Sequence, residues 1–266
     1  MKPNFVAAFC IALMLNCISS YAWGPEGHDI IASIAERHLT RKTRKELDRL
    51  LEGKSIIYYA SWMDNLRNAP DWKNGRDSTK TWHYANVDEG YTYQAMPKNP
   101  AGDVVTSLNK LTATLASDRG QLPDSTKADY VKMIVHMVGD MHCPMHAGRL
   151  SDRGGNSVKV KWFGKATDLH SVWDSHLVGS SREWSFSEWT DQLDRTDREF
   201  KKNAVSGSYE DWFDTTVGYA AQTYDYIDRK GTNLSYQFIY DFSPVLEEQL
   251  LLAGYRLAHV LNSIFK

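Results

Sequence analysis

The segment 126–142 constrains the fold of this 266-residue chain most strongly, because it is apolar on nearly every side and still carries two ionisable residues. A helix that is apolar all round is usually buried in a protein core. His136 and Asp140 lie four residues apart in this segment and therefore share one helix face. Burying an imidazole and a carboxylate without partners is costly. The core must therefore hydrogen-bond the two groups to each other or supply a further partner, such as a metal ion.

The first 22 residues have the pattern of a secretory signal peptide. Lys2 precedes an apolar run over 5–18, and a small-x-small cleavage site follows that run. The run is shorter than the roughly 20 residues that span a bilayer. We therefore predict cleavage between Ala22 and Trp23, which leaves one mature domain over 23–266. This domain is expected to be secreted or periplasmic, without stable membrane association.

The composition restricts both the function and the means of stabilisation. Charged residues make up 24% of the chain and hydrophobic residues 42%, as in ordinary soluble globular proteins. A formal net charge of −2 argues against a protein that holds nucleic acid by a broad basic surface. Cys10 and Cys17 lie in the signal peptide, so the mature chain keeps only Cys143 and cannot form an internal disulfide. Metal ions are therefore candidates for a structural staple.

Hydrophobic periodicity predicts a mainly α, single-domain, multi-helix, bundle-like fold with a small β-hairpin. Alternating apolar residues predict a strand over 157–162, followed by a turn at 163–164. A capping-box pattern predicts that the buried helix begins near Thr126, and Pro244 is expected at the first position of the last helix. The other expected helices cover 27–39, 41–52, 55–67, 103–117, 168–178, 187–203 and 208–227.

A second His-x-x-x-Asp pair, His170 and Asp174, follows the predicted hairpin. Pro144 must end or break the helix that carries the first pair, which frees His146 to point elsewhere. Histidine and aspartate without a thiolate suit a hydrolytic zinc site better than a structural one, because carboxylates and open positions support bound water. Further candidate ligands lie earlier in the chain, at His28, Asp64 and His83.

Six motifs connect these residues in a fixed order. They are Trp23-Gly-x-x-Gly-His28, Ser-Trp-x-Asp64, Trp-His83-Tyr, His136-x-x-x-Asp140-x-His-x-Pro-x-His146, Gly154-Gly155-Asn156 and Leu-His170-x-Val-Trp-Asp174. Together they resemble the S1/P1 nuclease family, whose members are exported trinuclear-zinc enzymes with a mainly α fold. The resemblance implies cleavage of single-stranded DNA and RNA to 5′-nucleotides, and 3′-nucleotidase activity toward nucleotides.

The resemblance implies nine ligand residues for three zinc ions (Zn²⁺) per chain. The first ion would be held by Asp64, His83, His136 and Asp140. The second would be held by the α-amino nitrogen and carbonyl oxygen of Trp23, by His28 and by a shared Asp140. The third would be held by His146, His170 and Asp174. Six metal charges against three carboxylates would make the site cationic within an acidic protein.

The resemblance also implies residues that act on the substrate. Arg67 would stabilise charge on the phosphate, beside the catalytic carboxylates Asp64 and Asp140; its alternative is a salt bridge to a ligand carboxylate or at the surface. Tyr84 would stack on a base, and two amides, Asn86 and Asn156, would line the base pocket. Each of the three has a purely structural alternative. Tyr84 would be a core residue, Asn86 a turn residue and Asn156 the start of the strand.

Two other functions remain open from the sequence. A zinc-dependent phospholipase C would have a similar metal arrangement, although such enzymes typically have glutamate where this chain has Asp174. A non-catalytic secreted zinc-binding protein would hold metal without turnover.

His142 lies inside the fourth motif and is expected to make a hydrogen bond behind the ligands. The protein is expected to be a monomer.

Overall fold

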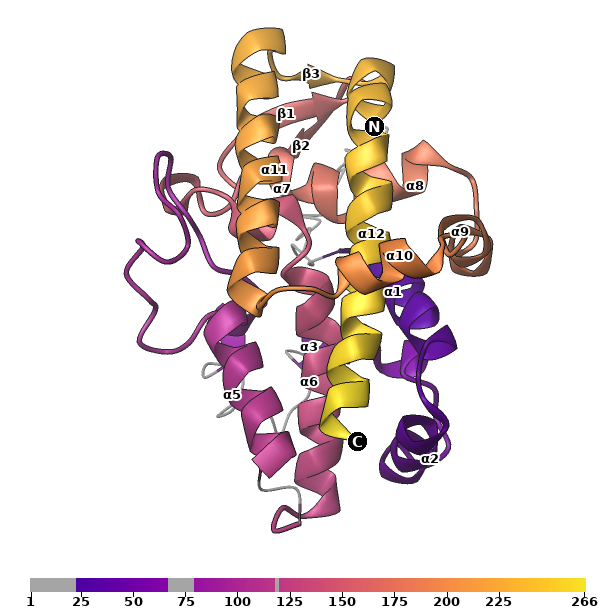
Figure 1. Ribbon diagram of the computed structural model, residues 1–266. Coiled ribbons are helices and arrows are strands. Elements are labelled where there is room, and N and C mark those ends of the chain that lie inside the picture. Colours follow the sequence, from indigo (N-terminus) through magenta and orange to yellow (C-terminus); the bar gives the residue numbers. More distant parts are fainter. Residues whose placement is uncertain (1–22, 67–78, 118–119) are drawn as a thin grey trace, which may run out of the picture.

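A computed structural model describes residues 23–66, 79–117 and 120–266. The helices of this part are α1 (Pro25–Arg37), α2 (Arg41–Leu50), α3 (Trp62–Asn65), α5 (Val104–Ser117), α6 (Asp124–Asp140), α7 (Leu169–Ser171), α8 (Leu177–Ser181), α9 (Phe186–Leu193), α10 (Arg198–Ala204), α11 (Tyr209–Lys230) and α12 (Tyr236–Ile264). In Figure 1, α5, α6, α11 and α12 run roughly along one axis, and a small sheet lies at one end of them. The mainly α, single-domain prediction is confirmed.

The long helix α12 packs along α1 and α6 and forms the centre of the core. At Gly254 the backbones approach so closely that a Cβ atom would lie 2.5 Å from Cγ2 of Ile34. Helix α6 is buried as predicted, with His136 and Asp140 both at 0% exposure. The core therefore surrounds the two ionisable residues, so any group that they bind lies inside the fold. None of the described helices is long and apolar enough to cross a membrane.

The sheet contains the predicted hairpin and one strand that periodicity missed. Strand β1 (Lys159–Trp162) pairs antiparallel with β2 (Lys165–Asp168). Phe163 and Gly164 form the turn, with φ of 48° and 79°. The added strand β3 (Asn233–Leu234) pairs parallel with β1, so the strand order is β2-β1-β3. With two residues, β3 is too short to show an alternation pattern.

The predicted helix over 55–67 is wrong in its described part. The chain instead forms a 3₁₀ turn at Ile57–Tyr59 and then the short helix α3. Ser61 lies between them at φ −101° and ψ 15°, outside helical geometry. The break leaves the carbonyl of Ala60 free to accept a hydrogen bond from Nδ1 of His136, at 2.8 Å. The break in the helix therefore supplies the hydrogen-bond acceptor for the buried His136.

The boundaries of other helices also differ from prediction. Helix α6 begins at Asp124, directly after Pro123 and without a side-chain cap, so the capping box near Thr126 is wrong. The segment 187–203 divides into α9 and α10, since Ser185 and Asp197 cap two separate helices.

Pro244 does not begin the last helix, because α12 starts eight residues earlier and continues through it. Proline removes one backbone hydrogen bond from a helix. Pro244 and Tyr240, whose carbonyl loses its donor, are both exposed, so water can replace that bond. Phe238 and Phe242 are buried on the other face, and their packing favours helix on both sides of the proline.

Candidate metal centre

Asp140, near the end of α6, is the centre of one group of imidazoles and carboxylates. Its Oδ2 lies 2.9 Å from Nδ1 of His83 and 3.2 Å from Nε2 of His136. Its Oδ1 lies 3.3 Å from Nε2 of His28, a residue of α1. Asp64 of α3 completes the group, with Oδ1 3.8 Å from Nε2 of His136. The structure thus brings together the five side chains predicted for the first two metal positions.

A second group surrounds Asp174, which lies in the helical segment 169–181. Its Oδ2 lies 3.2 Å from Nε2 of His170, and its Oδ1 lies 3.9 Å from Nε2 of His146. The two imidazole rings are stacked, with centroids 5.2 Å apart. Nδ1 of His146 is 3.9 Å from Oδ1 of Asp140, so the two groups adjoin. The three side chains predicted for the third position therefore converge.

Three of these histidines are oriented by backbone carbonyls. Nδ1 of His136 donates to the carbonyl of Ala60, Nδ1 of His146 donates to the carbonyl of His83 at 2.6 Å, and Nδ1 of His170 donates to the carbonyl of Gly154 at 2.6 Å. A neutral ring that donates from Nδ1 carries its lone pair on Nε2. In each ring Nε2 faces a carboxylate of the group. This is the arrangement by which proteins orient metal-binding histidines.

Several buried polar atoms in the two groups have no hydrogen-bond partner within the described part of the chain. They are Nε2 of His28, Oδ1 of Asp140 and Oδ2 of Asp174. The distance of 3.3 Å between His28 and Asp140 is short enough for an ion pair, but the geometry is not that of a hydrogen bond. Unsatisfied buried lone pairs of one imidazole and two carboxylates are the donor set that a divalent cation completes. The residues therefore fit a metal ion.

The electrostatics of the two groups differ. Around Asp140, burial disfavours the charged imidazole, but the carboxylates of Asp140 and Asp64 outweigh it and raise the pKa of His136 to about 9. Around Asp174, burial lowers the pKa of His146 to about 3 and raises the pKa of Asp174 to about 6. The first group is therefore rich in negative charge and attracts a cation, whereas the second keeps a neutral imidazole as a nitrogen donor.

Trp23 lies next to both groups. Its side chain is fully buried, and its ring meets that of Trp173 edge to face, with centroids 6.4 Å apart. The following residue, Gly24, donates its N–H to the carbonyl of Asp174. His28 lies on the first turns of α1, so Trp23 and His28 enter the site from the same end of that helix. The predicted chain start is therefore close to residues of both groups.

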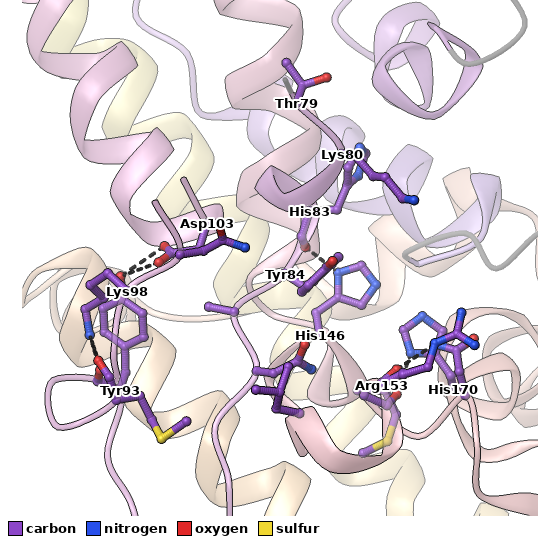
Figure 2. A pocket seen from close by; sticks show the side chains of 18 of the residues that line it. Thr79, Lys80, His83, Tyr84, Tyr93, Lys98, Asp103, His146, Arg153 and His170 are labelled. Atoms are coloured by element: carbon purple, nitrogen blue, oxygen red, sulfur yellow. Dashed lines mark hydrogen bonds between the residues drawn. The ribbon is translucent and has the colours of Figure 1, made fainter. Parts of the chain in front are cut away.

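A pocket of about 940 Å³ opens over the two groups. His83, His146 and His170 line it, together with the predicted substrate residues Tyr84, Asn86 and Asn156. Figure 2 shows His83, Tyr84 and His146 in its centre. The loop 84–103 forms the wall at the end of the pocket away from His170. In this loop the hydroxyl of Tyr93 donates to Asp103 at 3.0 Å. The pocket thus brings the predicted base-binding residues to the same opening as the candidate ligands.

The two predicted amides are themselves held by the backbone around the pocket. Nδ2 of Asn86 donates to the carbonyl of Gly148 at 2.9 Å, and Nδ2 of Asn156 donates to the carbonyl of Arg153 at 2.8 Å. These bonds hold both amide groups against the backbone around the pocket. Arg67, predicted to contact the phosphate, lies outside the described residues.

Three residues of this region escaped sequence reasoning. Cys143 donates its thiol to Oδ1 of Asp174 at 3.6 Å, and burial raises the pKa of that thiol well above its usual range. Gly139 leaves room for the ring of His28, since a Cβ there would lie 2.7 Å from its Nδ1. Arg153 lines the pocket. The Gly154-Gly155 pair in the sequence indicates the turn that contains Arg153. No spacing rule points to Cys143 or Gly139.

His142 faces away from both groups. Its Nδ1 donates to the carbonyl of Val138 at 2.7 Å, and its Nε2 accepts from Arg256 at 2.8 Å. Gln249 donates to its carbonyl at 2.7 Å. His142 therefore joins the end of α6 to α12.

The match to a known family includes every candidate ligand residue. The S1/P1 Nuclease family model matches residues 23–266. Endonuclease 3 of Arabidopsis thaliana is 27% identical over all of this chain and 96% of its own length. Endonuclease 2 of the same plant is 25% identical over 92% of this chain and 91% of its own length. Nuclease S1 of Aspergillus oryzae is 26% identical over 92% of each chain. On this match, the chain belongs to the S1/P1 nuclease family.

Proposed function

We propose that this protein is a secreted or periplasmic trinuclear-zinc endonuclease. It hydrolyses single-stranded DNA and RNA to 5′-nucleotides and removes 3′-phosphates from nucleotides. The observation that carries the proposal is the convergence of eight buried or half-buried histidine and aspartate side chains beneath one open pocket. Family membership supplies the reaction class, hydrolysis of nucleic acid.

The chain's own residues would divide the work as follows. Asp64, His83, His136 and Asp140 would hold one zinc ion. Trp23, through its free amino terminus and its carbonyl, would hold a second with His28 and Asp140. His146, His170 and Asp174 would hold the third. Bound zinc supplies Lewis-acid chemistry there, because it neutralises phosphate charge and lowers the pKa of water.

Orientation and base binding belong to the protein. The carbonyls of Ala60, His83 and Gly154 hold three imidazoles in place before any ligand binds, so little reorganisation accompanies metal or substrate binding. Tyr84 would stack on a base of the substrate, and stacking tolerates any base. Asn86 and Asn156 would hydrogen-bond its edge, while Arg67 would contact the phosphate.

The decisive experiment uses the protein that begins at Trp23, assayed on denatured DNA, RNA and phosphatidylcholine vesicles. Metal analysis should give three zinc ions per chain. We expect cleavage of both nucleic acids to products with 5′-phosphates, abolished by EDTA and restored by Zn²⁺. Hydrolysis of phosphatidylcholine without cleavage of nucleic acid would identify a phospholipase C instead. Bound zinc without EDTA-sensitive hydrolysis of any substrate would identify a zinc-binding protein.

Asp140 offers a second test, since it is proposed to serve two metal positions. The substitution Asp140→Asn keeps the size of the side chain and removes its charge. We expect this variant to lose two of the three zinc ions and nearly all activity. Retention of three ions in a folded variant would disprove the shared role.

A further inference from the structure

Among the described residues, two lysines and one arginine line the pocket, and their surroundings differ. The ammonium of Lys98 donates to the carbonyl of Met96 at 3.2 Å and lies 3.6 Å from the ring centroid of Tyr93. Lys80 lies next to the candidate ligand His83. The guanidinium of Arg153 has no hydrogen-bond or ion-pair partner in the described part of the chain, although it is exposed at the pocket.

The backbone of Arg153 is strained. Its φ of 60° and ψ of 45° lie in the left-handed region, and Gly154 and Gly155 continue it with φ of 64° and 81°. Glycine adopts this conformation readily, whereas a residue with a Cβ atom does so at a cost in free energy. Stability therefore does not account for arginine at this position. Side chains kept in strained conformations cluster at ligand-binding sites.

The strained turn also fixes how Arg153 lies relative to the candidate ligands. The carbonyl of the next residue, Gly154, accepts the hydrogen bond that orients His170. His170 and Asp174 are buried, with exposures of 7% and 1%, whereas Arg153 is exposed. Figure 2 draws Arg153 and His170 at the same end of the pocket, with Lys98 and Tyr93 at the other. The guanidinium therefore lies at the rim, outside the second ligand group.

We propose that Arg153 binds a backbone phosphate of single-stranded nucleic acid, one neighbouring the phosphate that is hydrolysed. The proposal rests on the proposed nuclease function. A guanidinium presents a planar fork of donors that matches two oxygens of one phosphodiester. Its rim position sets it apart from the buried groups that would act on the scissile phosphate. Arg153 is thus a substrate-binding residue for strands that carry more than one phosphate.

The test compares two substrates in steady-state kinetics with the zinc-loaded protein. A dinucleoside monophosphate carries only the scissile phosphate, whereas a ten-nucleotide single strand also carries neighbouring phosphates. For Arg153→Gln we expect KM for the long strand to rise about three- to tenfold with kcat within twofold, and KM for the dinucleotide to stay unchanged. The dependence of log KM on log salt should weaken by about 0.7, the value for one phosphate contact in a single strand. Arg153→Lys should restore part of the loss.

Two further variants separate binding from structure. Arg153→Gly removes the charge and relieves the backbone strain, so its melting temperature should equal or exceed that of the parent while KM for the long strand still rises. Arg149→Gln is the matched control from the same loop, because the Arg149 side chain pairs with Glu89 and stacks on Tyr224; its KM should not change.

Three outcomes would overturn the assignment of Arg153. They are an unchanged KM for the long strand in Arg153→Gln, an equal rise for both substrates, and a large fall in the melting temperature of Arg153→Gly. Inactivity of the parent protein on both substrates would instead refute the proposed nuclease function itself.

Discussion

At the scale of single residues, the site depends on atoms that carry no chemistry themselves. Carbonyl oxygens of Ala60, His83 and Gly154 orient three imidazoles. Gly139 contributes by lacking a side chain, because its Cα faces the ring of His28. Such supporting groups typically change metal affinity or activity by about 10- to 100-fold when altered. Of these groups, Gly139 can be changed by a simple substitution, and it is as informative to mutate as the candidate ligands.

Gly139→Ala tests this dependence. A Cβ at this position would lie 2.7 Å from Nδ1 and 2.9 Å from Cε1 of His28, so the buried ring must move. We expect this variant to lose the zinc ion assigned to His28 and its nuclease activity to fall at least about tenfold. Gly218→Ala in α11 is the matched control, since nothing lies within 4 Å of its Cβ. That variant should gain about 1 kcal/mol of unfolding free energy and keep full activity. Equal behaviour of the two variants would contradict the role of Gly139.

The amino terminus supplies a second residue-scale prediction. A deprotonated α-amine is a good metal ligand, whereas a peptide nitrogen is not. A protein with three extra residues before Trp23 should therefore fold but lose one zinc ion and most of its activity. Metal analysis and nucleic-acid cleavage measure this directly, with the protein that begins at Trp23 as the reference. Full activity of the extended protein would remove Trp23 from the ligand set.

At the scale of elements, periodicity locates helices but not their interruptions. The apolar pattern of α6 identifies it as a buried helix, and the break at 60–61 escapes because the bond that favours it reaches His136, 76 residues away. Pro244 likewise reads as a helix start in isolation, yet it lies on the exposed face of α12. The candidate ligands were predictable because their motifs are contiguous. Gly139 was not, since its contact with His28 joins two helices. Arg153 was not, since its backbone conformation and its position at the pocket are features of the folded structure.

Asp194 shows how element ends are fastened together. At the end of α9, its carboxylate accepts from the hydroxyl of Tyr255 at 2.7 Å and lies 2.9 Å from Nε2 of His38 and 3.5 Å from Nζ of Lys201. Partial burial raises its pKa, but the hydrogen bonds from Tyr255 and His38 outweigh that and leave the pKa below the usual 3.8. The folded state therefore binds the proton more weakly than the unfolded state.

The lowered pKa of Asp194 predicts that the free energy of unfolding decreases at acid pH. A carboxyl whose pKa is lowered by folding contributes stability above its unfolded value, and that contribution is lost as the pH falls through the folded pKa. Asp194→Asn should therefore be less stable than the parent at neutral pH, and the gap should close below pH 3.8. Urea unfolding from pH 2.5 to 7 measures both curves. A gap that is constant with pH would rule out this contribution.

At the scale of the whole molecule, the site and the core are the same region. Candidate ligands come from α1, α3, α6, α7 and the segments between them, and most are buried. Within the part of the chain that the structure describes, Cys143 is a free thiol, so no disulfide holds these elements together. Metal ions that bind several distant segments would therefore stabilise the folded state over the unfolded one.

Removal of metal should accordingly destabilise the entire protein. We expect chelation, with metal loss verified, to lower the melting temperature by about 6 to 16 °C, because a loss of about 3 to 4 kcal/mol of binding free energy costs about 2 to 4 °C per kcal/mol in a domain of this size. Added Zn²⁺ should restore it. Scanning calorimetry of the two forms gives the comparison. An unchanged melting temperature after complete removal would show that apolar packing alone sustains the fold.

The loop 84–103 is a part of the pocket that contains none of the candidate metal ligands. It forms one wall of the pocket without any helix or strand. Its first residues are anchored by bonds from Ala85 to the carbonyl of His146 and from Val87 to that of Gly148. Tyr93 is a further anchor, since it is buried and bonds to Asp214 and Asp103. Between these anchors the loop is mostly exposed, and exposed loop residues tolerate insertion and replacement. The wall can therefore be lengthened, shortened or exchanged while every histidine and aspartate beneath it stays in place. A change in the exposed part of this wall would therefore alter the shape of the pocket without moving the candidate ligands.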